Sequence, residues 1–209
     1  MGKISNISGI VLAGGKSSRI GRDKGSLMVG GISLAERSLS KMNDLFDEVI
    51  YVTNDQAPHP ATPPFKIARD EIPHLGPLGG ILAGLKNMKN KRAFIVAYDM
   101  PFVSPELVRY LIQIDEEADV VVPEIDGKLE PLHAVYGDQC VDLISTQLSN
   151  HDSKIINFYD KANAIHVSEE QIKKIDPDLR SFFNINTWDD IKEAMSMIGK
   201  EKTGGSENG

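Results

Sequence analysis

Short apolar runs alternate with amphipathic segments along most of this chain. Apolar runs bounded by glycine, proline or polar residues are typical of buried strands. They cover residues 7–12, 48–54, 65–68, 93–101, 118–125, 129–137 and 164–168. Between them, apolar residues recur at a helical spacing in residues 33–45, 76–88, 104–114, 138–148 and 186–198. This alternation predicts a three-layer α/β/α fold, Rossmann-like, with a mostly parallel sheet covered by helices on both faces.

Local signals support two of these helices and complicate a third. Ser33 and Ser104 stand where a side chain caps a helix N-terminus, and a proline follows Ser104 in the first turn, where its missing N–H costs little. Gly79, Gly80 and Gly84 lie inside the segment 76–88, although each glycine weakens a helix by up to ~1 kcal/mol. We therefore expect close packing or a close ligand approach along this helix.

Composition narrows the classes of protein that remain. The length of 209 residues suggests one domain, which we assign to residues 1–197, and residues 198–209 are polar and glycine-rich, as in a disordered tail. A net charge of -7 argues against a nonspecific nucleic-acid binder, and no apolar run approaches the ~20 residues of a membrane span. Cys140 is the only cysteine, which excludes an intrachain disulfide and a cysteine-rich metal site. These observations favour a cytoplasmic protein that binds neither nucleic acid nor membrane.

A basic, glycine-rich loop follows the first predicted strand, where the chain reads LAGGKSSRIGRDKG. A Walker A loop requires a glycine at the position of Ile10, and a dinucleotide fingerprint requires a spacer between its first two glycines, whereas Gly14 and Gly15 are adjacent. The string instead resembles the loop of nucleotidyltransferases, Leu-Ala-Gly-Gly followed by Ser-x-Arg and Asp-Lys. The glycine pair would let backbone N–H groups approach a base or phosphate. Arg19 and Lys24 would donate to a triphosphate.

Two further segments place polar side chains near this loop. Ligands of such sheets bind at the carboxyl ends of the strands, and Asp99 stands at one of these ends, in AYDMPFVSPELV. A carboxylate there suits Mg²⁺. The segment FFNINTWDDI carries Asn184 and Asn186 ahead of the last predicted helix. With the loop, these motifs resemble, in the same order, those of the molybdenum cofactor guanylyltransferases.

The resemblance implies a fold like that of nucleotide-diphospho-sugar transferases. It implies an enzyme that transfers GMP from GTP to the terminal phosphate of molybdopterin, with release of pyrophosphate. The implied partners are GTP and molybdopterin, with other proteins of cofactor biosynthesis as further candidates. Asp99 and Asn186 would hold the Mg²⁺ cofactor, and Asn184 is the alternative second ligand. The implied catalytic residues are Lys24, Arg19 and Asp99. The implied nucleotide-binding residues are Leu12, Ala13, Gly14, Gly15, Lys24, Asn54, Asp70 and Asp99.

Several of these residues also fit simpler roles. Asp99 and Asn54 suit ordinary loops, Asn186 with Thr187 suits a helix cap, and His133 suits an ordinary strand position. Two related activities stay open, a cytidylyltransferase of the same cofactor and a guanylyltransferase of another phosphorylated acceptor. Cytidylyl relatives generally read Leu-Ala-Ala-Gly, so the second glycine of the pair Gly14-Gly15 favours the guanylyl branch. A noncatalytic nucleotide-binding protein on the same fold is a third alternative.

Overall fold

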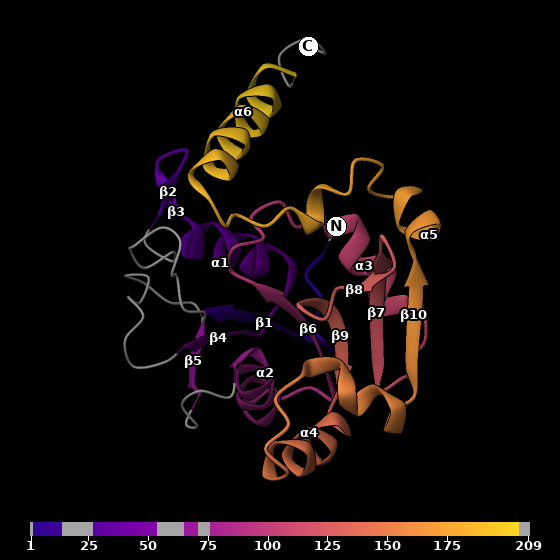
Figure 1. Cartoon of the computed structure of the whole chain (residues 1–209). Coiled ribbons are helices and arrows are strands. Elements are labelled where there is room, and N and C mark those ends of the chain that lie inside the picture. Colours follow the sequence, from indigo (N-terminus) through magenta and orange to yellow (C-terminus); the bar gives the residue numbers. More distant parts are fainter. Residues whose placement is uncertain (1, 14–26, 54–64, 71–75, 205–209) are drawn as a thin grey trace.

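The computed structural model describes residues 2–13, 27–53, 65–70 and 76–204, the last six of them by their backbone alone (Figure 1). The main sheet has the order β10-β7-β9-β6-β1-β4-β5, with β8 paired to β7. Its strands are β1 (Ser8–Ala13), β4 (Val49–Thr53), β5 (Lys66–Arg69), β6 (Arg92–Ala97), β7 (Val120–Ile125), β8 (Lys128–Leu129), β9 (His133–Gly137) and β10 (Ala164–Ser168). A separate short hairpin joins β2 (Met28–Val29) to β3 (Ile32–Ser33).

The sheet is mostly parallel, as the alternating pattern predicts. β1 runs parallel to β4 and β6, β4 to β5, and β7 to β10. β9 runs antiparallel to both of its neighbours, β6 and β7, and the sequence pattern did not predict this reversal. Its physical reason is the short connection, since parallel neighbours need a crossover of about a dozen residues or more. Between β7 and β9 lie only the turn at Asp126–Gly127, β8 and residues 130–132.

The helices begin where the capping signals predict. Ser33 forms a capping box with Glu36 at the start of α1, and the Ser104 side chain accepts a hydrogen bond from the Leu107 N–H at the start of α3. The last helix continues through Gly204, past residue 197, where we expected the domain to end. The helices are α1 (Leu34–Leu45), α2 (Gly76–Asn87), α3 (Pro105–Gln113), α4 (Cys140–Ser149), α5 (Glu169–Lys173) and α6 (Trp188–Gly204), with 3₁₀ turns η2 (Ile155–Lys161) and η3 (Arg180–Phe182). Within the described residues, no helix is both long and apolar enough to cross a membrane.

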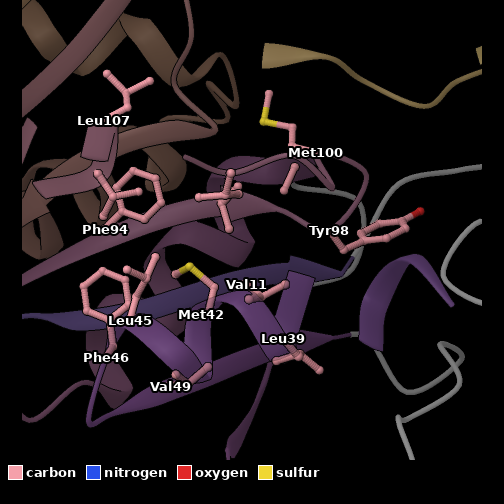
Figure 2. Packing of buried hydrophobic residues seen from close by; sticks show 14 of the residues in the cluster. Val11, Leu39, Met42, Leu45, Phe46, Val49, Phe94, Tyr98, Met100 and Leu107 are labelled. Carbon is pink, nitrogen blue, oxygen red and sulfur yellow. The ribbon is translucent and has the colours of Figure 1, made fainter. Parts of the chain in front are cut away.

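Two hydrophobic cores lie on opposite faces of the sheet, because alternate residues of a strand point to opposite sides. Val11 of β1 belongs to the core that also contains residues of α1, α3, α5 and α6, whereas its neighbour Ile10 belongs to the core that contains residues of α2 and α4. Figure 2 shows the first core, in which Met42 and Phe46 from the α1 side lie against β1 and β6. The rings of Phe46 and Phe94 are stacked with their centroids 6.2 Å apart. The two cores and the sheet form the three layers predicted from sequence.

Close packing explains one of the glycines inside α2, Gly84. A Cβ at Gly84 would lie 2.8 Å from Cγ2 of Ile10, whereas a Cβ at Gly80 would lie 3.5 Å from Cδ2 of Leu12, an ordinary contact. Gly84→Ala is therefore expected to lower the free energy of unfolding by about 1–3 kcal/mol, despite the better helix propensity of alanine. Gly80→Ala on the same helix is expected to leave it unchanged or to raise it by up to ~1 kcal/mol. Urea unfolding of both variants tests this packing, and an equal effect of the two substitutions would contradict it.

Candidate functional site

The carboxyl ends of four neighbouring parallel strands define one edge of the sheet. β1, β4, β5 and β6 end at Ala13, Thr53, Arg69 and Ala97, and all four lie side by side. Hydrogen bonds connect the residues that follow. The Tyr98 N–H, just after β6, donates to the Leu12 carbonyl on β1 at 3.1 Å. This edge is the one at which ligands of parallel α/β sheets bind.

Four of the predicted nucleotide-binding residues lie at this edge, namely Leu12, Ala13, Asp70 and Asp99. Leu12 and Ala13 are buried at the end of β1. Asp70 follows β5 and is half-buried, and its N–H donates to the Thr53 carbonyl of β4 at 3.1 Å. The two strand ends are thereby joined, and Asp70 is held at the same edge as the end of β1.

The predicted loop residues lie outside the described residues. These are Gly14, Gly15, Arg19, Lys24 and Asn54. The described chain bounds the first loop on both sides, because Ala13 ends β1 and the Leu27 carbonyl accepts a hydrogen bond from the Leu34 N–H at 3.0 Å. Residues 14–26 therefore connect the carboxyl edge of the sheet to the first turn of α1.

Asp99 and the Asn184–Asn186 segment meet at this edge. The Ile185 N–H donates to the Asp99 carbonyl at 3.0 Å, which links the residues after β6 directly to the residues before α6. Asp99 and both asparagines are half-buried, so each side chain is partly accessible. Two motifs that are widely separated in sequence thus present oxygen-bearing side chains close to the end of β1.

The side chains of Thr187 and Asp190 form the cap at the start of α6. The Asp190 N–H donates to the Thr187 hydroxyl at 3.2 Å, and a carboxylate oxygen of Asp190 accepts from the backbone N–H groups of Asn186 and Thr187 at 2.7 Å each. The cap is thus made by the side chains of Thr187 and Asp190. Asn186 contributes its backbone N–H to it. The Asn184 side-chain amide donates to the Phe182 carbonyl at 3.2 Å.

A buried carboxylate that the sequence interpretation missed, that of Asp176, holds the turn η3, which precedes the asparagine segment. Asp176 is buried and accepts hydrogen bonds from the backbone N–H groups of Arg180 and Ser181 at 3.1 and 2.8 Å. The Ser181 hydroxyl in turn accepts from the Ser104 N–H at 3.2 Å, at the cap of α3. These bonds tie η3 to the loop that follows Asp99. The available sequence signal was Asp176 before a proline, a common turn pair.

His133 lies on β9, and aromatic rings enclose its side chain. It stands opposite Val96 in the β6–β9 register, with ring centroids 5.0 Å from Phe94 and 4.8 Å from Phe182. Among the described residues, neither ring nitrogen has a hydrogen-bond partner. Desolvation lowers the pKa of His133 to about 3, against a smaller opposing effect of the Asp176 charge. His133 is therefore uncharged at neutral pH and supports Phe182 beneath the asparagine segment.

Cys140 offers no nucleophile to this site. Its thiol is buried at the start of α4 and donates to the Asp119 carbonyl at 3.2 Å. Desolvation raises the pKa of Cys140 to about 12, so the thiolate is scarce at neutral pH. Within the described ranges, no three histidine, cysteine, aspartate or glutamate side chains gather as a metal cage.

Comparison with known proteins agrees with this geometry. The model of the MobA-like NTP transferase domain matches residues 9–164. A probable molybdenum cofactor guanylyltransferase from Natranaerobius thermophilus is 36% identical over 200 residues, which are 93% of this chain and 98% of that protein. A molybdenum cofactor guanylyltransferase from Desulfosudis oleivorans is 34% identical and covers 92% of this chain and 96% of its own length.

Solved structures with the same fold include related and distant proteins. The crystal structure of molybdopterin-guanine dinucleotide biosynthesis protein A from Archaeoglobus fulgidus has a TM-score of 0.79 and 29% identity, covering 93% of this chain and all of that one. A 2-C-methyl-D-erythritol 4-phosphate cytidylyltransferase from Thermus thermophilus has a TM-score of 0.68 at 14% identity, over 91% of this chain and 98% of its own. The second likeness concerns the fold alone.

Proposed function

We propose that this chain, which belongs to the MobA-like NTP transferase family, transfers GMP from GTP to the terminal phosphate of molybdopterin. The products are the guanine dinucleotide form of the cofactor and pyrophosphate. The observation that supports this most is the Ile185–Asp99 hydrogen bond of 3.0 Å, because it joins two predicted site motifs at the carboxyl edge of the sheet. The lone, buried Cys140 is consistent with a cytoplasmic location for this reaction.

The residues at this edge fit a bound Mg²⁺. Mg²⁺ takes oxygen ligands, commonly one or two from the protein together with water and substrate phosphates. Asp99 supplies a carboxylate, and the neighbouring Asn186 supplies an amide oxygen in a half-buried position. We assign these two residues as its protein ligands, with Asn184 as the alternative to Asn186. When bound, the ion would neutralise charge on the phosphates of the nucleotide.

The reaction we propose is an in-line displacement at the α-phosphorus of GTP. An oxygen of the molybdopterin phosphate forms a bond to this phosphorus as the bond to the bridging α–β oxygen breaks, and both electrons of that bond leave with pyrophosphate. The attacking group is already an oxyanion, so no general base is required. Arg19 and Lys24 would donate hydrogen bonds to the phosphates and stabilise the charge on the leaving group. The enclosed, uncharged His133 agrees with a mechanism that uses no histidine.

Recognition of the base would involve the end of β1 and the residue after β5. Leu12 to Gly15 would pass beside the nucleotide, where the paired glycines leave room for a purine. Asp70, held to β4 by its backbone N–H, would contact the guanosine. Both assignments concern the nucleotide alone.

Titration with four nucleotides tests the guanine assignment. With Mg²⁺ present, GTP is expected to bind at least about tenfold more tightly than CTP, ATP or UTP, because a buried polar edge left unpaired costs about 1–3 kcal/mol. Isothermal titration calorimetry measures the four dissociation constants. Preference for CTP would support the cytidylyltransferase alternative instead. Tight GTP binding without transfer to any phosphorylated acceptor would support a noncatalytic protein.

A further inference from the structure

The two peptide groups on either side of the Asp99 Cα are both hydrogen-bonded by distant parts of the chain. The carbonyl of Asp99 itself accepts a hydrogen bond from the Ile185 N–H at 3.0 Å. The carbonyl before it, that of Tyr98, accepts from the Ser38 hydroxyl at 2.9 Å. Because two fixed peptide groups define the direction of the intervening Cα–Cβ bond, these two bonds set the direction in which the Asp99 side chain leaves the backbone.

The Ser38 hydroxyl bonds to the chain just beyond the end of the strand that leads to Asp99. β6 stops at Ala97, and Tyr98 is buried near the end of β1 (Figure 2). Removing a donor from a buried carbonyl costs free energy. Ser38 lies on the sheet-facing side of α1 and is fully buried. A serine inside a helix usually bonds to a carbonyl of its own helix, whereas this one bonds to a residue 60 positions away.

Ser38 also connects two parts of the site through α1. The Leu27 carbonyl accepts from the Leu34 N–H in the first turn of α1. One turn further along, the same helix bonds to the residue before Asp99. α1 thus links Leu27, the first described residue after residues 14–26, to the residue before Asp99.

We propose that Ser38 is a positioning residue that aligns Asp99 for the Mg²⁺ complex of the nucleotide. This inference rests on the proposed role of Asp99 as a ligand of Mg²⁺. Ser38 itself contacts neither the nucleotide nor the ion. Its hydroxyl acts through the Tyr98 carbonyl on the backbone from which the Asp99 side chain extends.

GTP binding with and without Mg²⁺ separates positioning from a general loss of stability. In the native protein, Mg²⁺ is expected to tighten GTP binding, and the ratio of the two dissociation constants measures this effect. Ser38→Ala is expected to reduce the ratio about tenfold, within the ~100-fold that a misplacement of about 1 Å can cost. The dissociation constant without Mg²⁺ is expected to stay unchanged. Calorimetry provides both constants and requires no turnover. If Ser38→Ala does not fold, Ser38→Cys is expected to reduce the ratio in the same direction, because a thiol donates a weaker hydrogen bond.

Ser8→Ala is the matched control, since Ser8 is also a fully buried serine with a hydroxyl hydrogen bond, to Glu48 at 2.5 Å. It lies at the start of β1, at the opposite end of the strand from the site. Ser8→Ala is expected to lower the melting temperature and to keep the native Mg²⁺ ratio. An unchanged ratio in the folded Ser38 variant, or an equal reduction in Ser8→Ala, would overturn the inference. Asp99→Asn distinguishes this from failure of the proposed function: if it also keeps the native ratio, the assignment of Asp99 is wrong.

Discussion

Replacing Asp99 by asparagine is expected to slow GMP transfer by about 100-fold or more, because removing one group that stabilises developing charge commonly costs 10²–10³ in rate. Asparagine keeps the size of the side chain and removes the negative charge that favours a divalent cation. Asp99 is half-buried, and its backbone is fixed by the Ile185 N–H, so we expect the variant to retain the native backbone at the site. The measurement is the rate of pyrophosphate release at saturating GTP, as a function of Mg²⁺ concentration.

Asp119→Asn is the control for this substitution. Asp119 is also half-buried, but it precedes β7 at the opposite edge of the sheet, where its carboxylate accepts from the Asn163 N–H at 2.8 Å. Its substitution is expected to affect stability and to leave the Mg²⁺ dependence of the rate unchanged. Full activity of Asp99→Asn, or equal losses in both variants, would contradict the role that we propose for Asp99.

The native protein is expected to lose stability as the pH falls, and replacing His133 by leucine is expected to remove much of this loss. The pKa of His133 is lowered to about 3 in the folded protein, because burial disfavours the charged ring. In the unfolded chain the histidine pKa is about 6.5. Between these two values the unfolded chain binds more protons than the folded protein, so the free energy of unfolding falls as the pH falls. One such group contributes a slope of up to about 1.4 kcal/mol per pH unit, which begins as the pH drops through about 6.5.

The measurement is the free energy of unfolding in urea between pH 7 and pH 5, before most carboxylates titrate. The native protein is expected to lose stability over this range, and His133→Leu is expected to lose distinctly less. Phe158→Leu serves as the control, because it changes a buried ring of the opposite core without removing a titratable group, so its pH profile should run parallel to that of the native protein. Parallel pH profiles for the native protein and His133→Leu would contradict a lowered pKa of His133 in the folded protein.

The layers of the fold could be predicted because the sequence signals are local. Buried strands such as β1 appear as continuous apolar runs, and the capping serines Ser33 and Ser104 mark the starts of α1 and α3. Every strand in the predicted list has a counterpart in the structure, with ends shifted by a few residues. The short hairpin β2–β3 escaped prediction because each strand has two residues, too few for a periodic pattern.

The contacts around Asp99 could not be predicted, because they depend on contacts between distant residues. The reversal of β9 was open to prediction, because only residues 126–128 separate the predicted strands 118–125 and 129–137, too few for a parallel crossover. Asp176 and Ser38 look like ordinary polar residues in the sequence. Their roles come from burial and from hydrogen bonds to η3 and to Tyr98.

For the predicted site residues, the sequence indicated positions that the structure describes, whereas their chemical roles are a separate question. Asp99, Asn186 and Asp70 were identified from short motifs, and the structure brings them to the carboxyl edge that the fold predicts. Their chemical roles remain predictions, as do those of Arg19 and Lys24, which lie outside the described residues. A motif can indicate which residues gather at an edge, but the ligand that they bind has to be measured.

Pyrophosphate release from GTP, with and without molybdopterin, tests the proposed transfer most directly. With Mg²⁺ and GTP present, the account predicts that adding molybdopterin starts pyrophosphate release, one for each guanine dinucleotide formed. Without molybdopterin, release is expected to stay at the level of uncatalysed hydrolysis. Release that is independent of molybdopterin, or that occurs with CTP and not with GTP, would contradict the proposed reaction.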